Sequence, residues 1–259
     1  MVRRKGFYCL FALALSITVG LATILPITHA SAASYSGSSS PSSNVLWGVD
    51  SVSFITPSFL SQIKRSNGTP QFIGRYLDAI AFSPMNASEA SYIHSQGIRI
   101  LPIQSDFGSD VGYGNGVTHA NDALTKAHAL GIPKGTIIID DIESNSAVDA
   151  GFIEGWYTTI SNAGYAVGYY ENPYAGSSHF NSAFCAAVGK NPAIGNSILH
   201  STEPSTGRTG RSDAPSFAPA GISCGGHTTG HAFIWQYGLA NGSSVNIDID
   251  EALSSVPLW

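Results

Sequence analysis

Short apolar stretches alternate with stretches of helical periodicity from residue 45 onward. The apolar stretches are rich in β-branched and aromatic residues and are bounded by Gly, Pro, Ser or Asn, which is typical of strands. The pattern predicts strands at 45–50, 72–76, 98–103, 136–143, 165–170, 197–200 and 232–237. It predicts helices at 57–65, 86–96, 118–130, 147–162 and 179–188.

Residues at the ends of these stretches support the helix predictions. Thr56 precedes Pro57, and Asn86 precedes a helix with Glu89 three residues on, which are N-terminal signals. Gly131 follows the third predicted helix, where a left-handed C-terminal residue is common. The glycine-rich segment 112–116 before that helix is predicted to be a flexible loop.

Repeated strand-then-helix units imply parallel strands joined by right-handed crossovers. Their repetition over residues 45–259 predicts an α/β fold, a (β/α)8 barrel of the TIM type. The pattern weakens over 202–230, which is rich in Gly, Pro, Ser and Thr, before a closing segment at 245–250, so we allow for an irregular last third. An open doubly wound sheet is the alternative.

Three carboxylates end the fourth predicted strand. Side chains alternate along a strand, so Asp141 and Glu143 share one face, with Cα atoms ~6.6 Å apart, and Asp140 lies on the other. Active sites of parallel α/β folds lie beyond the carboxyl ends of their strands. Asp141 and Glu143 are therefore candidates for acid/base catalysis, although a solvated strand end is the simpler alternative.

Polar and aromatic residues also gather at the other predicted strand ends, although only 11% of the chain is charged. Carboxylates can transfer protons, aromatic rings can contact sugar faces, and amides or guanidinium groups can bind hydroxyls and carboxylates. Beside Asp50, the substrate-binding candidates are Arg75, Tyr76, Gln104, Asp106, Tyr170, Glu171, Trp235, Gln236 and Tyr237. The structural alternatives are a loop cap for Asp50, an internal ion pair for Arg75, and core packing for Trp235 and Tyr237.

Four short motifs occur in an order that resembles family 25 glycoside hydrolases. They are Gly48-Val49-Asp50, Asp141-Ile142-Glu143, Trp235-Gln236-Tyr237 and Ile247-Asp248-Ile249-Asp250. Members of that family are (β/α)-barrel lysozymes that cleave N-acetylmuramyl linkages in peptidoglycan. The chain resembles more closely the glycoside-hydrolase-like domain known as domain of unknown function 1906. That likeness rests on the GVDS opening, the GRYL of the second strand, the ALGIP-KGT lead into the acidic strand and the NIDID ending, and it spans residues 45–253.

This resemblance implies roles for four acids. Glu143 matches the acid that protonates the glycosidic oxygen, and Asp141 matches the neighbouring carboxylate that stabilises positive charge. Asp50 and Asp248 match two further aspartates at the rim. The implied function is a muramidase-like glycoside hydrolase acting on peptidoglycan or a related polysaccharide.

Two other functions stay open. The first is a catalytically silent envelope protein that binds glycan through the same rim. The second is hydrolysis of an ester or amide, which no nucleophile–base pair or serine nucleophile elbow supports.

The N-terminal segment predicts export. Arg3, Arg4 and Lys5 precede an apolar stretch at 7–25 and an Ala-Ser-Ala site, which together predict a signal peptide at 1–32. An uncleaved membrane anchor is the alternative. Residues 33–44 are predicted to be a Ser/Gly/Pro-rich linker and 45–259 the barrel domain. We expect a secreted or cell-wall-associated monomer with no stable membrane insertion after signal cleavage, because no later stretch approaches ~20 apolar residues.

Two cysteines remain after removal of the signal, which contains Cys9. In an oxidising compartment Cys185 and Cys224 most simply form one disulfide, and two buried free thiols are the alternative.

Composition also argues against other classes of function. A formal net charge of -5 gives no basic surface for nucleic acid. His227 and His231 have a spacing that suits metal ligands on a helix, but their surroundings are glycine-rich. We expect neither a metal nor another cofactor.

Overall fold

The structure is a computed structural model that describes residues 44–78, 83–105, 109–142, 147–173, 179–225, 227–241 and 246–259. Its strands are β1 (Val45–Ser51), β2 (Phe72–Asp78), β3 (Arg99–Gln104), β4 (Ile137–Asp141), β5 (Ala166–Glu171), β6 (Ile198–Thr202), β7 (Ile222–Cys224), β8 (His227–Asn241) and β9 (Asn246–Leu253). Its helices are α1 (Pro57–Ser66), α2 (Ala87–Ser95), α3 (Tyr113–Leu130), α4 (Ala150–Asn162) and α5 (Phe180–Lys190), with short 3-10 turns η1 (Pro192–Asn196) and η2 (Arg211–Asp213). The predicted signal peptide, most of the linker, Asp106 and Glu143 lie outside these ranges.

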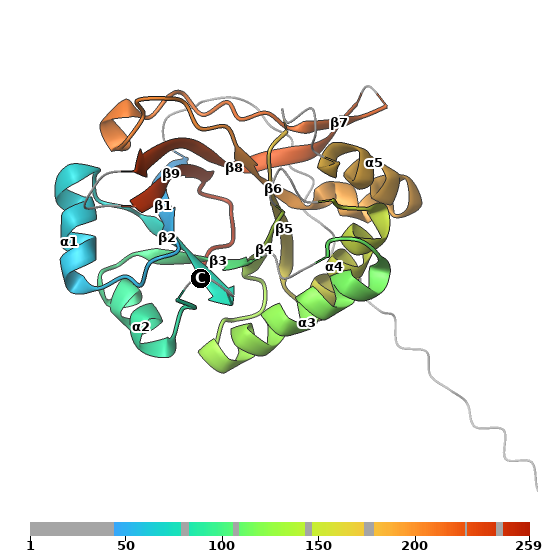
Figure 1. The fold of residues 1–259 in the computed structure, drawn as a ribbon, viewed down its shortest axis with the longest axis horizontal. Coiled ribbons are helices and arrows are strands. Elements are labelled where there is room, and N and C mark those ends of the chain that lie inside the picture. Colours follow the sequence, from blue (N-terminus) through green and yellow to red (C-terminus); the bar gives the residue numbers. More distant parts are fainter. Residues whose placement is uncertain are drawn as a thin grey trace, which may run out of the picture. The chain divides into compact units, whose positions relative to one another are not determined.

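Eight strands close into a barrel, which confirms the predicted fold class and excludes the open sheet. The strand order is β6-β5-β4-β3-β2-β1-β9-β8, and a pairing between β6 and β8 completes the ring. Helices α1 to α5 lie outside the strands (Figure 1). Among the described residues, every helix is too short or too polar to span a bilayer.

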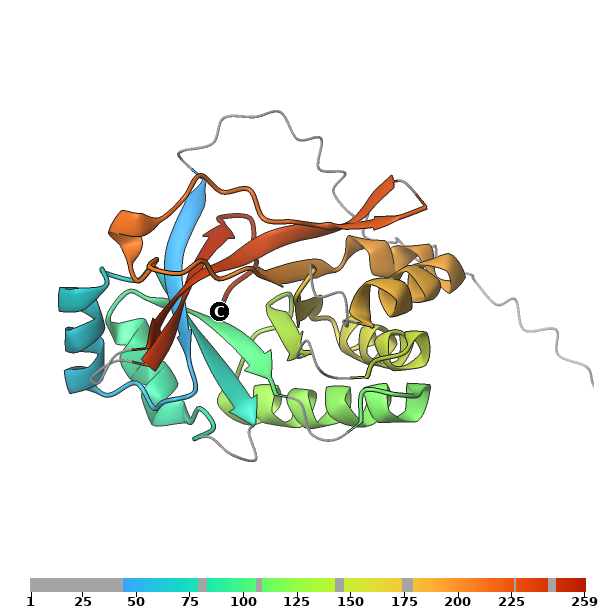
Figure 2. The same cartoon turned by 45° about the horizontal axis from the view of Figure 1, so that its top comes forward.

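The last third of the barrel is irregular. Strands β1 to β6 run parallel, and β8 is parallel to β6, but β9 is antiparallel to both β1 and β8. Where the repeating unit would place a helix after β6, an extended segment at 203–221 runs along the outside of β8 (Figure 2). Backbone hydrogen bonds from Ser205 N to Tyr237 O and from Leu239 N to Arg208 O attach this segment to β8.

The predicted helix ends are confirmed at three positions. The side chain of Thr56 accepts a hydrogen bond from Phe59 N, and Asn86 accepts one from Glu89 N. Gly131 ends α3 with φ 75°, in the left-handed region. Each feature satisfies backbone groups that a helix end leaves without a partner.

The prediction of a loop at 112–116 was wrong, because α3 begins at Tyr113. Two glycines explain the difference. A Cβ atom at Gly116 would overlap the carbonyl oxygen of Phe152 on α4, and one at Gly155 would overlap that of Tyr113. The glycines therefore allow α3 and α4 to pack closely, instead of making the segment flexible.

Strand β4 has the alternation that the sequence predicted. Ile137 and Ile139 pack with Phe72 and Leu101 in the barrel interior. Ile138 belongs to the core between the strands and the helices. Odd-numbered residues of β4 thus point inward, and Asp141, at its end, points toward the mouth of the barrel.

Candidate active site

Three of the four predicted catalytic acids lie together at the carboxyl end of the barrel. Asp50, next to the last residue of β1, lies directly opposite Asp248 of the antiparallel strand β9. Both line a small pocket of about 50 Å³ together with Tyr76 of β2. Asp141 of β4 is close enough for its charge to act on both Asp50 and Tyr76. Glu143, the fourth acid, follows two residues after Asp141 and lies outside the described residues.

This crowding changes the acidity of the site. Burial is the largest cause that raises the pKa of Asp50 well above its ordinary value, followed by repulsion from Asp250, Asp248 and Asp141. The pKa of Tyr76 is also raised well above its usual value, first by burial and then by the charges of Asp141 and Asp50. Asp50 therefore stays protonated in a pH range where an exposed aspartate is ionised.

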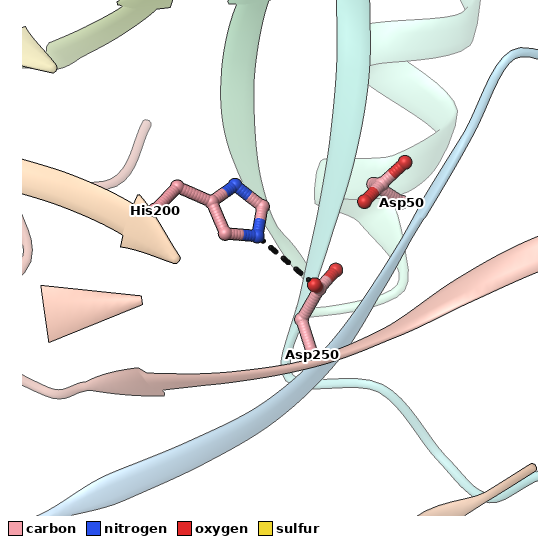
Figure 3. Close-up of side chains that lie close together, drawn as sticks. All are labelled: Asp50, His200 and Asp250. Carbon is pink, nitrogen blue, oxygen red and sulfur yellow. Dashed lines mark hydrogen bonds and ion pairs between the residues drawn. The ribbon is translucent and has the colours of Figure 1, made fainter. Parts of the chain in front are cut away.

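A buried pair beneath the pocket was missed by the sequence analysis. His200 Nε2 lies 3.1 Å from Asp250 Oδ1, and both side chains are fully buried. Figure 3 shows the carboxylate groups of Asp50 and Asp250 and the imidazole of His200 turned toward one another, so the three side chains form a compact cluster inside the barrel. The ring of Tyr170 meets His200 edge-on with centroids 5.0 Å apart.

A sequence signal for this pair existed. Asp250 shares the inward face of β9 with Asp248, two residues earlier, and His200 ends the sixth predicted strand. The alternation rule that selected Asp141 would have selected Asp250 too.

These three side chains are also the cluster among the described residues that could hold a metal ion. One potential ligand atom from each of Asp50, His200 and Asp250 lies within 4.8 Å of the others. Imidazole and carboxylate groups are common zinc ligands. However, the His200–Asp250 hydrogen bond and a protonated Asp50 beside Asp250 account for these distances. We therefore describe the cluster as a hydrogen-bonded network.

Two predicted binding residues lie in the barrel interior next to this network. Tyr170 donates a hydrogen bond from its hydroxyl to Gln236 Oε1 at 2.7 Å. Thr202 donates to the same oxygen. Gln236 is 2% exposed, so these contacts fix the inner wall of the barrel beside His200.

Arg75 is not at the site, because it points to the helix side of β2. Its Nε lies 2.7 Å from Glu89 Oε1 of α2, and both side chains are fully buried. Its Nη1 donates to Ser51 O at 2.5 Å. Arg75 therefore joins α2 to the barrel wall, which is the structural alternative for this residue.

Gln104 and Glu171 also lie on the helix side. Gln104 is fully buried and in register with Asp140, which points toward His119 of α3 at 3.9 Å. Glu171 shares its face of β5 with Tyr169, whose ring packs against α5. Burial and repulsion from Glu203 raise the pKa of Glu171 to about 8. Neither residue can line the same pocket as Asp50.

The two aromatic candidates of β8 point outward as well. Tyr237 is fully buried; its hydroxyl accepts a hydrogen bond from Trp47 Nε1 at 2.8 Å and donates one to Gly210 O at 2.9 Å. Trp235 packs edge-on against Phe217, with centroids 6.2 Å apart. These residues belong to the outer layer of the barrel, and only Gln236 between them faces inward.

The disulfide between Cys185 and Cys224 is present and joins α5 to β7.

Asp106, the remaining binding candidate, lies outside the described residues. Of the predicted residues, the structure thus gathers Asp50, Tyr76, Asp141 and Asp248 at the mouth and Tyr170 and Gln236 beneath it.

Proteins with a similar sequence or fold are known. The family model of the Rv2525c-like, glycoside hydrolase-like domain matches residues 62–252. An uncharacterized protein of B. stearothermophilus is 32% identical, with a TM-score of 0.75, over 83% of this chain and 100% of that chain. No curated protein matches the chain.

Two more distant structures share the fold. The Tat-secreted protein Rv2525c of Mycobacterium tuberculosis, crystallised with L-tartrate, is 18% identical with a TM-score of 0.53 over 83% of this chain and 98% of that one. The spore cortex lytic enzyme SleM of Clostridium perfringens is 13% identical with a TM-score of 0.53 over 82% of this chain and 68% of that one.

Proposed function

Because this chain belongs to the Rv2525c-like, glycoside hydrolase-like family, we propose that it is a secreted enzyme that hydrolyses glycosidic bonds in peptidoglycan or a related cell-wall polysaccharide. The spore cortex lytic enzyme that shares its fold supports this class of substrate. The disulfide supports export, because disulfides persist in oxidising compartments.

One observation carries the proposal: carboxylates from β1, β4 and β9 converge around Tyr76 at the mouth of the barrel. Glycoside hydrolysis needs a protonated carboxyl group and an ionised one on either side of the scissile bond. Crowded acids supply both states at the same pH, because each ionised group raises the pKa of its neighbours.

We assign the roles as follows. Glu143 donates a proton to the leaving oxygen, as the family 25 resemblance implies. Asp141 stabilises the positive charge that develops on the sugar ring. Asp50 and Asp248 accept hydrogen bonds from sugar hydroxyls, while Asp250 and His200 hold Asp50 from below.

The test is the release of reducing ends by the purified chain from insoluble peptidoglycan and from a panel of soluble glycans. We expect activity on at least one cell-wall glycan, and we expect Glu143→Gln to remove it while the protein still unfolds at the same temperature. Hydrolysis that survives Glu143→Gln would exclude the assigned acid. Sedimentation with peptidoglycan without any turnover would instead favour a catalytically silent glycan-binding protein.

A further inference from the structure

A second pocket lies on the outside of the barrel, and we call it the outer pocket. It has a volume of about 390 Å³, and its lining includes Trp47, Arg211, Pro215, Phe217 and Glu251. Pockets that bind small ligands have volumes of ≈ 300–1,000 Å³. Trp47 of β1 and Glu251 of β9 point outward, whereas Asp50 and Asp250 on the same strands point inward. The barrel wall therefore separates the outer pocket from the acid cluster.

The outer wall of this pocket is the extended segment 203–221, which is held at several points. Arg211 N donates to Asn67 O of the α1 C-terminus at 2.7 Å. Ala220 N donates to Glu203 Oε1 at 2.6 Å. Strand β7, which follows the segment directly, is joined to α5 by the disulfide at Cys224. These contacts fix the wall before any ligand arrives, which lowers the entropic cost of binding.

Glu251 is the polar group at the base of the pocket. Its neighbours in register are Trp47 on β1 and Trp235 on β8, so two indoles flank its carboxylate. The residue is 7% exposed, and its Oε2 has no hydrogen-bond partner among the described residues. Burial raises the pKa of Glu251 to about 7, although the charge of Arg208 acts in the opposite direction. An unpaired buried oxygen destabilises the protein, and a hydrogen-bond donor on a ligand would remove that cost.

Two aromatic side chains, Trp47 and Phe217, contribute to the apolar lining of the pocket, and contacts fix their positions. Trp47 donates its Nε1 hydrogen to Tyr237, which orients the indole. Phe217 on the opposite wall rests against Trp235. Arg211 is exposed at the edge. Fixed aromatic surfaces, one buried acceptor and one exposed guanidinium are suited to an amino sugar, which offers an apolar ring face, N–H and O–H donors, and oxygen acceptors.

We propose that the outer pocket binds one sugar residue of the cell-wall glycan, as a second site separate from the catalytic mouth. The sugar face packs against Phe217 and Trp47, a hydroxyl or acetamido N–H donates to Glu251, and Arg211 donates to an oxygen at the pocket edge. The glycan class rests on the proposed function. The site itself rests on the pocket, its unpaired acceptor and its fixed aromatic walls.

The experiment measures binding of an N-acetylglucosamine tetramer by calorimetry and of insoluble peptidoglycan by sedimentation. All proteins carry Glu143→Gln so that the glycan is not consumed. We expect Phe217→Ala and Glu251→Gln each to weaken binding at least tenfold, and Arg211→Ala to weaken it several-fold. Tyr113→Ala is the matched control, because Tyr113 is an aromatic residue on α3 that is 50% exposed and lies away from the pocket. Thermal unfolding of each variant shows whether the fold is retained.

The outcomes separate this inference from the proposed function. Binding that is unchanged in all three folded pocket variants overturns the outer site, even if the enzyme is active. Binding that depends on Glu251 and Phe217 supports it, even if the chain with Glu143 intact shows no turnover. If no glycan binds at all, the outer site is wrong, and hydrolysis by the chain with Glu143 intact remains the separate test of activity.

Discussion

Asp50 and Asp248 lie directly opposite each other on the antiparallel strands β1 and β9. Like charges at directly opposite positions destabilise a sheet. Here two further acids, Asp250 and Asp141, also raise the pKa of Asp50. Such crowding has no benefit for stability and is typical of sites where a carboxyl group must keep its proton.

The network beneath the mouth predicts how Asp50 responds to mutation. After burial, Asp250 is the largest cause of the raised pKa of Asp50, so Asp250→Asn should lower that pKa. Carboxyl carbon chemical shifts, followed by NMR as the pH is changed, measure it directly. Asp213→Asn, a change in η2 on the outside of the barrel, serves as the control and should leave the pKa unchanged. An equal change in the pKa of Asp50 in both variants would contradict a direct effect of Asp250 on Asp50.

Two adjacent acids on β4 should behave differently, because they point to opposite sides. Asp141→Asn should reduce kcat by ~100-fold or more, the usual size of the loss when one group that stabilises transition-state charge is removed. Asp140→Asn should leave kcat within a few-fold of the original while lowering the melting temperature, since Asp140 is buried beside His119 on the helix side. A loss of kcat for Asp140→Asn with an unchanged melting temperature would contradict this assignment.

Glu171 should make stability depend on pH. Its pKa is about 8 in the folded chain and 4.5 ordinarily, so the folded state binds the proton more tightly than the unfolded state. This group therefore costs no stability below pH 4.5; its cost grows as the pH rises from 4.5 to 8 and is constant above 8. Glu171→Gln should be close to neutral at about pH 4 and stabilising by about 4 kcal/mol at about pH 9, as measured by urea unfolding. The same gain at both pH values would exclude ionisation as the cause.

The Arg75–Glu89 pair should matter for stability and not for substrate. Arg75→Ala leaves Glu89 buried without its partner, and such changes cost ~3–5 kcal/mol. Lys190→Ala breaks the exposed pair with Glu154 and should cost less than ~1 kcal/mol. For any glycan that is cleaved, KM should be unaffected by Arg75→Ala at a temperature where the variant is folded. A large rise in KM would show that Arg75 contributes to substrate binding.

The disulfide should stabilise both the fold and the outer pocket. Its cysteines are 39 residues apart, for which the chain-entropy model gives ~4 kcal/mol. The Cys185→Ser/Cys224→Ser double variant should lose about that much unfolding free energy. It should also bind the N-acetylglucosamine tetramer more weakly, because the wall at 203–221 loses an anchor. Unchanged stability would show that hydrogen bonds alone hold the segment.

Local sequence patterns predicted much of this fold. Alternating apolar runs placed the parallel strands, and Thr56, Asn86 and Gly131 placed helix ends, because each signal acts within a few residues. The prediction of a loop at 112–116 was wrong because Gly116 allows close packing against α4. Glycine in the sequence does not reveal whether it is there for a turn or for close packing.

The predicted binding residues show a second limit of prediction from local sequence. Adjacent residues at one strand end cannot share a face, so Tyr76 and Arg75, like Tyr170 and Glu171, had to divide between the inside and the helix side. Strict use of the alternation of side chains along a strand would have removed about half of the predicted binding residues. The choice of which member faces inward came from the packing of Ile and Phe residues on neighbouring strands.

The sequence by itself determined that acids and aromatic residues stand at the strand ends, since that depends on local order along the chain. Only the tertiary structure decided which of them meet. Asp50 faces Asp248, and Asp250 reaches His200, because β9 runs antiparallel between β1 and β8 and so closes the barrel. The pairing of β9 with β1 joins residues nearly the whole domain apart, which no short motif encodes.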